Sequence, residues 1–243
     1  SQTQPLYTRY YLNDGASQPV NHDLDLTYSK HIVLGYSQKL NKNFGIKAEA
    51  YYQDLTGIPV EVDSSAFSLT NAGSGFARVF PNELNNDGTG YNYGLELTIQ
   101  RYFNKNWHAL FSGCLYNSRY TPSDGIERNT SFNGIYAANF LAGREFQIKN
   151  NTLGLGVKVT GAGGKRKGIV DHAASEEQGE VIFQDAGFNE SQFKDYFRFD
   201  IKTTYKINKN KITHEIGIDL VNVTSSKNIL SYSYAPNSTP DLN

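Results

Sequence analysis

The feature that most constrains the fold of this chain is the alternation of apolar and polar residues over long runs. Between Tyr91 and Phe103, apolar side chains fill the odd positions as far as Ile99, and polar residues or glycine fill the even positions. Successive side chains of a β-strand point to opposite faces, so this run predicts a strand with one apolar and one polar face. The pattern recurs at 46–53, 153–160, 197–207 and 212–220, more weakly at 32–40, 107–118 and 132–148, and least clearly in the end segments 6–12 and 230–235. The chain is therefore predicted to be all-β, with about nine or ten antiparallel strands.

The connections between these runs alternate between short and long. Short turns rich in Asn and Lys are predicted at 41–43, 104–106, 149–151 and 208–210, and Asn tolerates the left-handed backbone that tight turns need. Long connections are predicted at 13–26, 54–90, 120–131 and 162–194. Sorting loops by length in this way is typical of outer-membrane β-barrels, which have short periplasmic turns and long extracellular loops.

Strand length and hydropathy agree with a transmembrane β-barrel. A tilted spanning strand needs roughly 9–11 residues, and the alternating runs reach that length, whereas strands of globular proteins average about 5–6. The mean hydropathy is −0.53 and no run of 18 apolar residues occurs, which excludes a transmembrane helix but not barrel strands that alternate. Aromatic residues near strand ends, such as Tyr91, Tyr120 and Phe197, fit interfacial girdles; filling a large β-core is the alternative use.

Composition and motifs point away from several other functions. The chain has 23 Lys and Arg against 24 Asp and Glu, so no nucleic-acid partner is predicted. The five histidines lack metal-ligand spacing, and the glycine-rich stretch 161–166 lacks the spacing of a phosphate loop. Cys114 is alone, which rules out a disulfide within the chain. We therefore predict no enzyme activity, no cofactor and no metal site, and we interpret the acidic stretch 171–180 as a solvated extracellular loop.

The stretch from Gly88 to Thr98 resembles a strand of TonB-dependent outer-membrane receptors of the Bacteroidetes type. The likeness continues in order through 123–125, 128–130, 132–134, 143–146, 151–155, 163–166, 195–200 and 222–228, so it covers nearly the whole chain. It implies a barrel of about 22 strands in the bacterial outer membrane, plugged by an N-terminal domain. It also implies energised uptake of a nutrient through the inner-membrane TonB complex.

The chain departs from the family pattern at both ends. Residues 1–243 are predicted to be a single segment of the barrel domain, without the plug domain or the last strand, and about nine or ten strands are too few to close the implied barrel. The resemblance thus predicts a fragment of the C-terminal half of a receptor. The partners it implies are outer-membrane lipid, the receptor's own N-terminal plug, the TonB complex through the missing N-terminal part, and an unknown nutrient ligand.

The polar faces of the strands supply the candidate site residues. In a barrel of this kind they line the lumen, where most of them keep the strands in register and the lumen wet. Contacts to ligand or plug are expected from lumenal residues and from the long loops. The candidates are Asn92, Glu96, Lys158, Arg198 and Asp200.

Two alternatives remain open from the sequence. A complete barrel of ten strands is a permitted topology for an outer-membrane protein. Like the outer-membrane proteases or lipases, such a barrel would carry an enzyme active site at its outer rim. Asp124, Asp171, His172 and Asp195 lie near the loops where such a rim would be. The other alternative is a soluble β-sandwich that binds carbohydrate, although the clean alternation disfavours it. Solubility without detergent would favour the sandwich.

Overall fold

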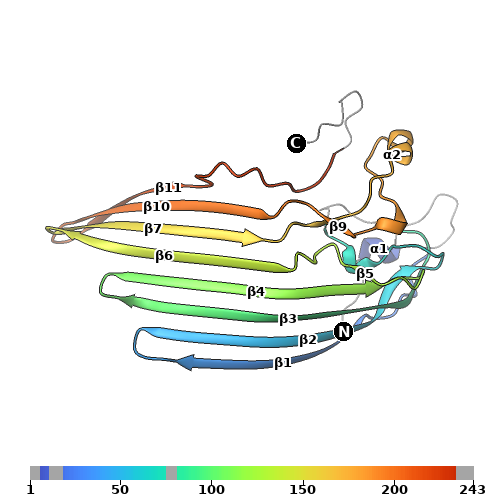
Figure 1. Ribbon diagram of the computed structural model, residues 1–243, viewed down its shortest axis with the longest axis horizontal. Helices are drawn as coiled ribbons and strands as arrows, with labels where there is room; N and C mark the ends of the chain where they lie inside the picture. The colour runs from blue at the N-terminus through green and yellow to red at the C-terminus, as the bar shows by residue number, and fades with distance from the viewer. Residues whose placement is uncertain (1–5, 11–18, 75–80, 234–243) are drawn as a thin grey trace.

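The computed structural model describes residues 6–10, 19–74 and 81–233, and it confirms an antiparallel all-β fold (Figure 1). Eight strands follow one another across an open sheet that is not closed into a barrel. They are β1 (Tyr28–Lys39), β2 (Phe44–Glu61), β3 (Leu84–Asn104), β4 (Trp107–Thr121), β6 (Tyr136–Ile148), β7 (Asn151–Ala162), β10 (Tyr196–Asn208) and β11 (Thr213–Leu220). Each pairs antiparallel with the next, because each hairpin returns the chain beside the strand it has just left.

The four predicted tight turns are confirmed, and they lie together at one end of the sheet (Figure 1). Lys105, Asn106 and Lys149 adopt positive φ angles of 49°, 66° and 55°. In the first turn the amide of Leu40 donates to the carbonyl of Phe44 at 2.9 Å. The turns at 104–106 and 149–151 therefore reverse the chain through left-handed backbone, which Asn tolerates.

The opposite end carries the long connections and most of the remaining elements. The two-residue strand β5 (Arg128–Asn129) pairs with β4, and β8 (Arg166–Lys167) pairs with β9 (Ser191–Gln192). Two 3₁₀ turns, η1 (Leu69–Asn71) and η2 (Asp185–Gly187), and the helices α1 (Leu6–Tyr10) and α2 (His172–Gln178) complete the set. No helix in the described ranges is long and apolar enough to cross a membrane.

Three predictions of local structure are wrong. The end segment 6–12 was predicted to extend as a strand, but α1 occupies 6–10, and 11–12 lie outside the described residues. In the segment 230–235, residues 230–233 are irregular and the rest lie outside the described residues. The acidic stretch 171–180 contains α2, because the Asp171 side chain caps the helix start at 3.1 Å from the Ala174 amide and Gly179 ends it with φ 70°.

The predicted loop 54–90 is shorter than expected, since β2 continues to Glu61 and β3 begins at Leu84. The pairing shifts register on both sides of Ile58. Gly57 has φ 69°, and a side chain there would meet the Leu26 carbonyl at 3.0 Å, so glycine permits this bulge. The bulge breaks the two-residue period, which is why the extension is invisible in the alternation pattern.

Buried apolar residues gather at the loop end and not along the sheet. Ile58, Val60, Ala66, Leu84 and Tyr120 are all less than 10% exposed. Two faces of the sheet can be distinguished by register. The apolar face carries Ile32, Leu34, Leu95, Leu97, Phe111, Phe140, Val157, Ile201, Ile216 and Ile218, and the polar face carries Glu49, Asn92, Glu96, Ser118, Lys158, Asp200, Lys202, Glu215 and Asp219. The sheet therefore acts as a platform that brings the loops together at one end.

Candidate functional site

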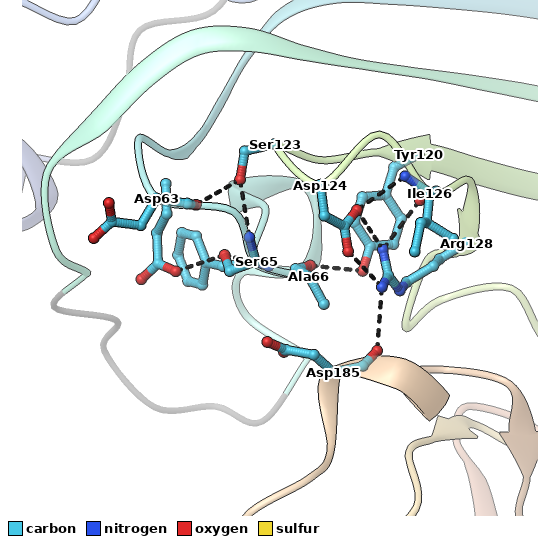
Figure 2. A network of polar contacts seen from close by, with 11 residues as sticks. Asp63, Ser65, Ala66, Tyr120, Ser123, Asp124, Ile126, Arg128 and Asp185 are labelled. Atoms are coloured by element: carbon cyan, nitrogen blue, oxygen red, sulfur yellow. Dashed lines mark hydrogen bonds and ion pairs between the residues drawn. The ribbon is translucent and has the colours of Figure 1, made fainter.

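The loop cluster at the end of β2 to β4 is held by hydrogen bonds between segments far apart in the chain (Figure 2). The hydroxyl of Tyr120, at the end of β4, donates to the Ala66 carbonyl at 2.9 Å. The Ser123 hydroxyl donates to the Asp63 carbonyl at 2.7 Å and accepts from the Ser65 amide at 3.1 Å. These bonds fix the connection after β2 against the connection after β4.

A buried ion pair joins this cluster to the connection between β7 and β10 (Figure 2). Arg128 contacts Asp124 in a bidentate arrangement, with nitrogen–oxygen distances of 2.8 and 2.6 Å, and the two side chains are only 3% and 13% exposed. Arg128 also donates to the Asp185 carbonyl at 3.2 Å. The hydrogen bonds from Arg128 hold the pKa of the Asp124 carboxyl below its usual range, and the Ile126 amide adds to this effect.

A second set of buried polar groups is built mainly from asparagines. Asn189, whose φ is 61°, donates to the Asn129 carbonyl at 2.9 Å. Asn133 donates to the side-chain oxygens of Asn117 at 2.7 Å and Asn129 at 2.8 Å. The Ser131 amide donates to Asn71 at 2.8 Å. Because buried amides cost free energy unless they are paired, this network fixes the loops in one arrangement over the polar face.

A hollow of about 390 Å³ lies between these loops and the polar face of the sheet. The strands contribute Tyr51, Gln53, Asn92 and Tyr116 from β2, β3 and β4. The lining also includes Thr70, Asn117, Ser118, Thr130 and Phe132, and none of the lining residues is charged. The hollow thus offers neutral hydrogen-bonding groups and aromatic rings, which suit an uncharged polar ligand better than an ion.

Within the hollow several polar groups already have partners. Asn92 donates to the Gln53 side chain at 2.7 Å, which positions both amides. The Tyr116 hydroxyl donates to the Phe132 carbonyl at 3.3 Å and accepts from the Gly134 amide at 3.2 Å. These bonds hold residues of the strands and of the loops together in one wall of the hollow.

The other charged candidates lie together on β7 and β10, away from that hollow. Lys158 and Asp200 are direct cross-strand partners, and Arg198 lies 3.0 Å from the Asp200 carboxylate. The Asn222 amide donates to the second Asp200 oxygen at 2.9 Å. Lys158 and Asp200 line a separate hollow of about 430 Å³ that extends along the polar face to Glu215 and Asp219. Opposite charges pair across this face, with Lys202 3.5 Å from Asp219 on the neighbouring strand β11 and Lys206 3.3 Å from Glu145 on β6, across β7.

The five sequence candidates therefore fall into three places. Asn92 lines the neutral hollow beneath the loops, whereas Lys158, Arg198 and Asp200 belong to the charged group on β7 and β10. Glu96 lies in neither group, and its cross-strand neighbours are Glu49 and Cys114. Whether any of the five contacts ligand or plug stays a prediction.

Sequence reasoning missed most of the lining of the neutral hollow. Tyr51 and Tyr116 were detectable, because each is an aromatic residue among polar ones on the polar side of its alternating run. Thr70 and Phe132 carry no such signal, since only the folded loops bring them to the sheet. No group of three or more His, Cys, Asp or Glu suited to a metal occurs within 6–10, 19–74 and 81–233.

Three of the four rim residues considered for an enzyme are held by structural contacts. Asp124 pairs with Arg128, and Asp171 caps α2. Asp195 accepts from the Tyr136 hydroxyl at 2.7 Å and from the Gly164 amide at 3.2 Å. Each of these carboxylates therefore has a structural partner.

Comparisons of the chain with protein-family models, with curated proteins and with solved structures give no match.

Proposed function

We propose that this chain is part of the transmembrane β-barrel of a TonB-dependent outer-membrane receptor that takes up a nutrient. The observation that carries this proposal is the distribution of charge on the apolar face. On β1 to β4 one cross-strand row at the loop side contains Lys30, Asp54, Tyr91 and Arg119. Between that row and Arg101 at the turn side, β3 presents only uncharged residues to this face.

The width of this uncharged band fits a bilayer. From Tyr91 to Arg101 the strand covers roughly 33 Å at about 3.3 Å per residue. Tilted by about 40–45°, as barrel strands are, that length spans about 25 Å along the membrane normal, which matches the apolar band of outer-membrane barrels. Leu34, Leu95 and Ile218 in the band are 77%, 60% and 61% exposed. Such an extent of exposed apolar surface indicates contact with lipid or protein.

The edges of the sheet support a larger barrel. In the described part of the chain, β1 and β11 each pair on one side only. Unpaired backbone groups cannot remain exposed in a bilayer, so both edges require strand partners, which further strands of the same barrel supply in this proposal. The short turns then face the periplasm and the loop cluster faces the cell exterior.

In this receptor the two hollows have separate roles. The neutral hollow beneath the loops contacts the nutrient through the amides of Asn92 and Gln53 and the rings of Tyr51 and Tyr116. The charged group around Lys158, Arg198 and Asp200 faces the plug. Ligand contacts from loops and lumen bias the plug toward a conformation on which the TonB complex acts. The chain itself performs no chemistry in this proposal.

The first test is the location and size of the native protein. An antibody against 84–104 is used on fractions of the bacterium that produces it, and we expect a band several-fold heavier than 27.1 kDa in the outer membrane. A band near 27.1 kDa in that membrane would instead indicate a small autonomous barrel, whose rim is then assayed for protease and lipase activity. Recovery in a soluble fraction without detergent would overturn the membrane assignment.

The second test addresses energised uptake. The purified full-length protein is mixed with the periplasmic domain of TonB from the same bacterium, and we expect a complex on size-exclusion chromatography. Absence of binding together with an outer-membrane location would leave a barrel that is not TonB-dependent.

A further inference from the structure

The two borders of the apolar face differ in charge. At the loop side, Lys30 lies directly opposite Asp54, so both signs are present. At the turn side the charged residues on this face, among those the structure describes, are Arg101 and Arg144, and no carboxylate accompanies them. The four turns beyond them add Lys42, Lys105, Lys149 and Lys209 and contain no Asp or Glu. An unneutralised row of cations favours an anionic partner at this border.

Arg101 is buried without a counter-ion. Its side chain lies over the Trp107 ring, with the guanidinium carbon 3.8 Å from the ring centroid, and 5.3 Å from that of Phe44. The residue is 7% exposed and donates to the Asn104 carbonyl at 3.1 Å, while its buried Nε has no partner. In the described part of the chain Arg101 forms no ion pair. Arg101 thus holds the Trp107 ring at the turn-side border of the apolar face by a desolvated cation–π contact, and it adds positive charge to that border.

Next to this ring the surface is hollowed. Trp107 is the cross-strand partner of Arg144, which is exposed. A hollow of about 310 Å³ is lined by Trp107, Ala142, Arg144, Leu155 and Val157, together with Gly143 and Gly156. One end of the hollow is cationic and aromatic and the rest is aliphatic. This is the amphipathic arrangement of a phospholipid at the boundary of its headgroup and acyl chain.

We propose that this hollow binds one phospholipid, with the phosphate on the Arg144 guanidinium and the start of an acyl chain against Ala142, Leu155 and Val157. The inference rests on the proposed function, because the proposed function places the apolar face against lipid. The short turns mark the periplasmic side, so the lipid comes from the periplasmic leaflet and is a phospholipid rather than lipopolysaccharide. Arg144 provides the charge-assisted hydrogen bonds, and Arg101 acts on the lipid through Trp107.

The test uses the full-length protein purified from outer membranes in a mild non-ionic detergent. Its binding of dioleoylphosphatidylglycerol is titrated by native mass spectrometry, with dioleoylglycerol as a probe that lacks the phosphate. We expect Arg144→Gln to weaken binding of the phospholipid about tenfold or more, as loss of a charge-assisted bond does. The matched control is Arg119→Gln, which removes a cation from the same face at the loop side and is expected to leave the affinity unchanged.

A variant at the ring completes the test. Trp107→Ala is expected to weaken binding of both probes, because it removes the wall for the chain, whereas Arg144→Gln weakens only the phosphate-bearing one. Equal affinity of the wild-type protein and Arg144→Gln would overturn the site, and so would preferential retention of lipid A. Failure of the membrane assignment on which this site rests is distinguishable, because the protein would then be absent from the outer-membrane fraction before any titration.

Discussion

The loop cluster and the body of the sheet are built from the same strands, yet they are stabilised in different ways. Val60 and Tyr120 in the cluster are 0% and 1% exposed, whereas Leu34 and Ile218 in the sheet are 77% and 61% exposed. The cluster buries its own side chains and forms its own ion pairs. No protein layer formed by the described residues lies against either face of the sheet body, so its stability depends on what covers it. Under the proposed function, lipid covers one face and the plug the other.

The same contrast holds for ion pairs. The side chains of Arg128 and Asp124 are 3% and 13% exposed, but those of Lys202 and Asp219 on the polar face are 61% and 59% exposed. Water screens exposed pairs, so the second pair contributes little on its own. Burial makes the first pair essential to the loops, because either partner alone would be an uncompensated charge.

The largest expected effect comes from breaking the buried pair. Arg128→Ala removes the counter-ion of the Asp124 carboxylate and the side-chain donor to the Asp185 carbonyl, and we expect a loss of about 3–5 kcal/mol of loop-cluster stability. Limited proteolysis of the full-length protein should show cleavage within 122–135. Lys202→Ala is the control and should change stability by less than about 1 kcal/mol. Equal protease resistance of the two variants would contradict the contrast between the regions.

The next effect concerns the two faces of β3. Leu95→Arg places a charge near the middle of the apolar face, and in a bilayer this costs about 2–4 kcal/mol. We expect much less folded protein in the outer membrane, measured as the band whose gel mobility changes on heating. Glu96→Arg changes the adjacent residue, which points to the opposite face, and is expected to assemble normally. If Glu96→Arg impaired assembly more than Leu95→Arg, the polar face would be assigned to lipid and the proposed orientation would be refuted.

A smaller effect is expected for one neutral hydrogen bond in the cluster. Tyr120→Phe removes the donor to the Ala66 carbonyl and should cost about 1 kcal/mol. Thermal unfolding of the full-length protein measures this change, with protease cleavage within 62–83 as the signal of unfolding. Tyr36→Phe serves as a control on the sheet body, because the Tyr36 hydroxyl bonds Gln38 at an exposed position and its loss should be undetectable.

The smallest expected effect is a response of the loops to acid. The folded-state pKa of Asp124 is lowered, chiefly by Arg128, so its contribution to stability is complete above the pKa of the unfolded chain. The contribution is lost as the pH falls below that value and through the folded-state pKa. Protease susceptibility of the loop cluster should therefore rise on acidification below the usual Asp range. Asp124→Asn should remove this part of the pH dependence, and an unchanged profile would contradict the assignment.

Much of the sheet was predictable, because strand faces are encoded locally. The alternating run 197–207 corresponds to β10 at 196–208, and the run 153–160 lies within β7 at 151–162. The turns were predictable for the same reason, since short polar segments rich in Asn between two alternating runs favour tight turns. The extension of β2 beyond Gly57 was not predictable, because a bulge changes which side chain faces which side.

The candidate site was predictable only in part. Asn92 was identified because it lies on the polar side of a strand near a long loop, and it lines the neutral hollow. Thr70 and Phe132 were not identified, because no period or motif links them to the strands. Glu96 has the same sequence signature as Asn92, yet it lies outside both the neutral hollow and the charged group on β7 and β10. Position along the strand, and not residue type, separates the two.

The sequence by itself determined most of the long strands, their two faces and the four tight turns, because these depend on side-chain period and backbone preference within a few residues. Only the tertiary structure decided which loops meet, that Arg128 joins Asp124 to the segment at Asp185, and that Arg144 lies beside Trp107 at the border of the apolar face. Those contacts join residues on different strands or loops. Their free energy comes from burial and charge in the folded molecule, which no local pattern specifies.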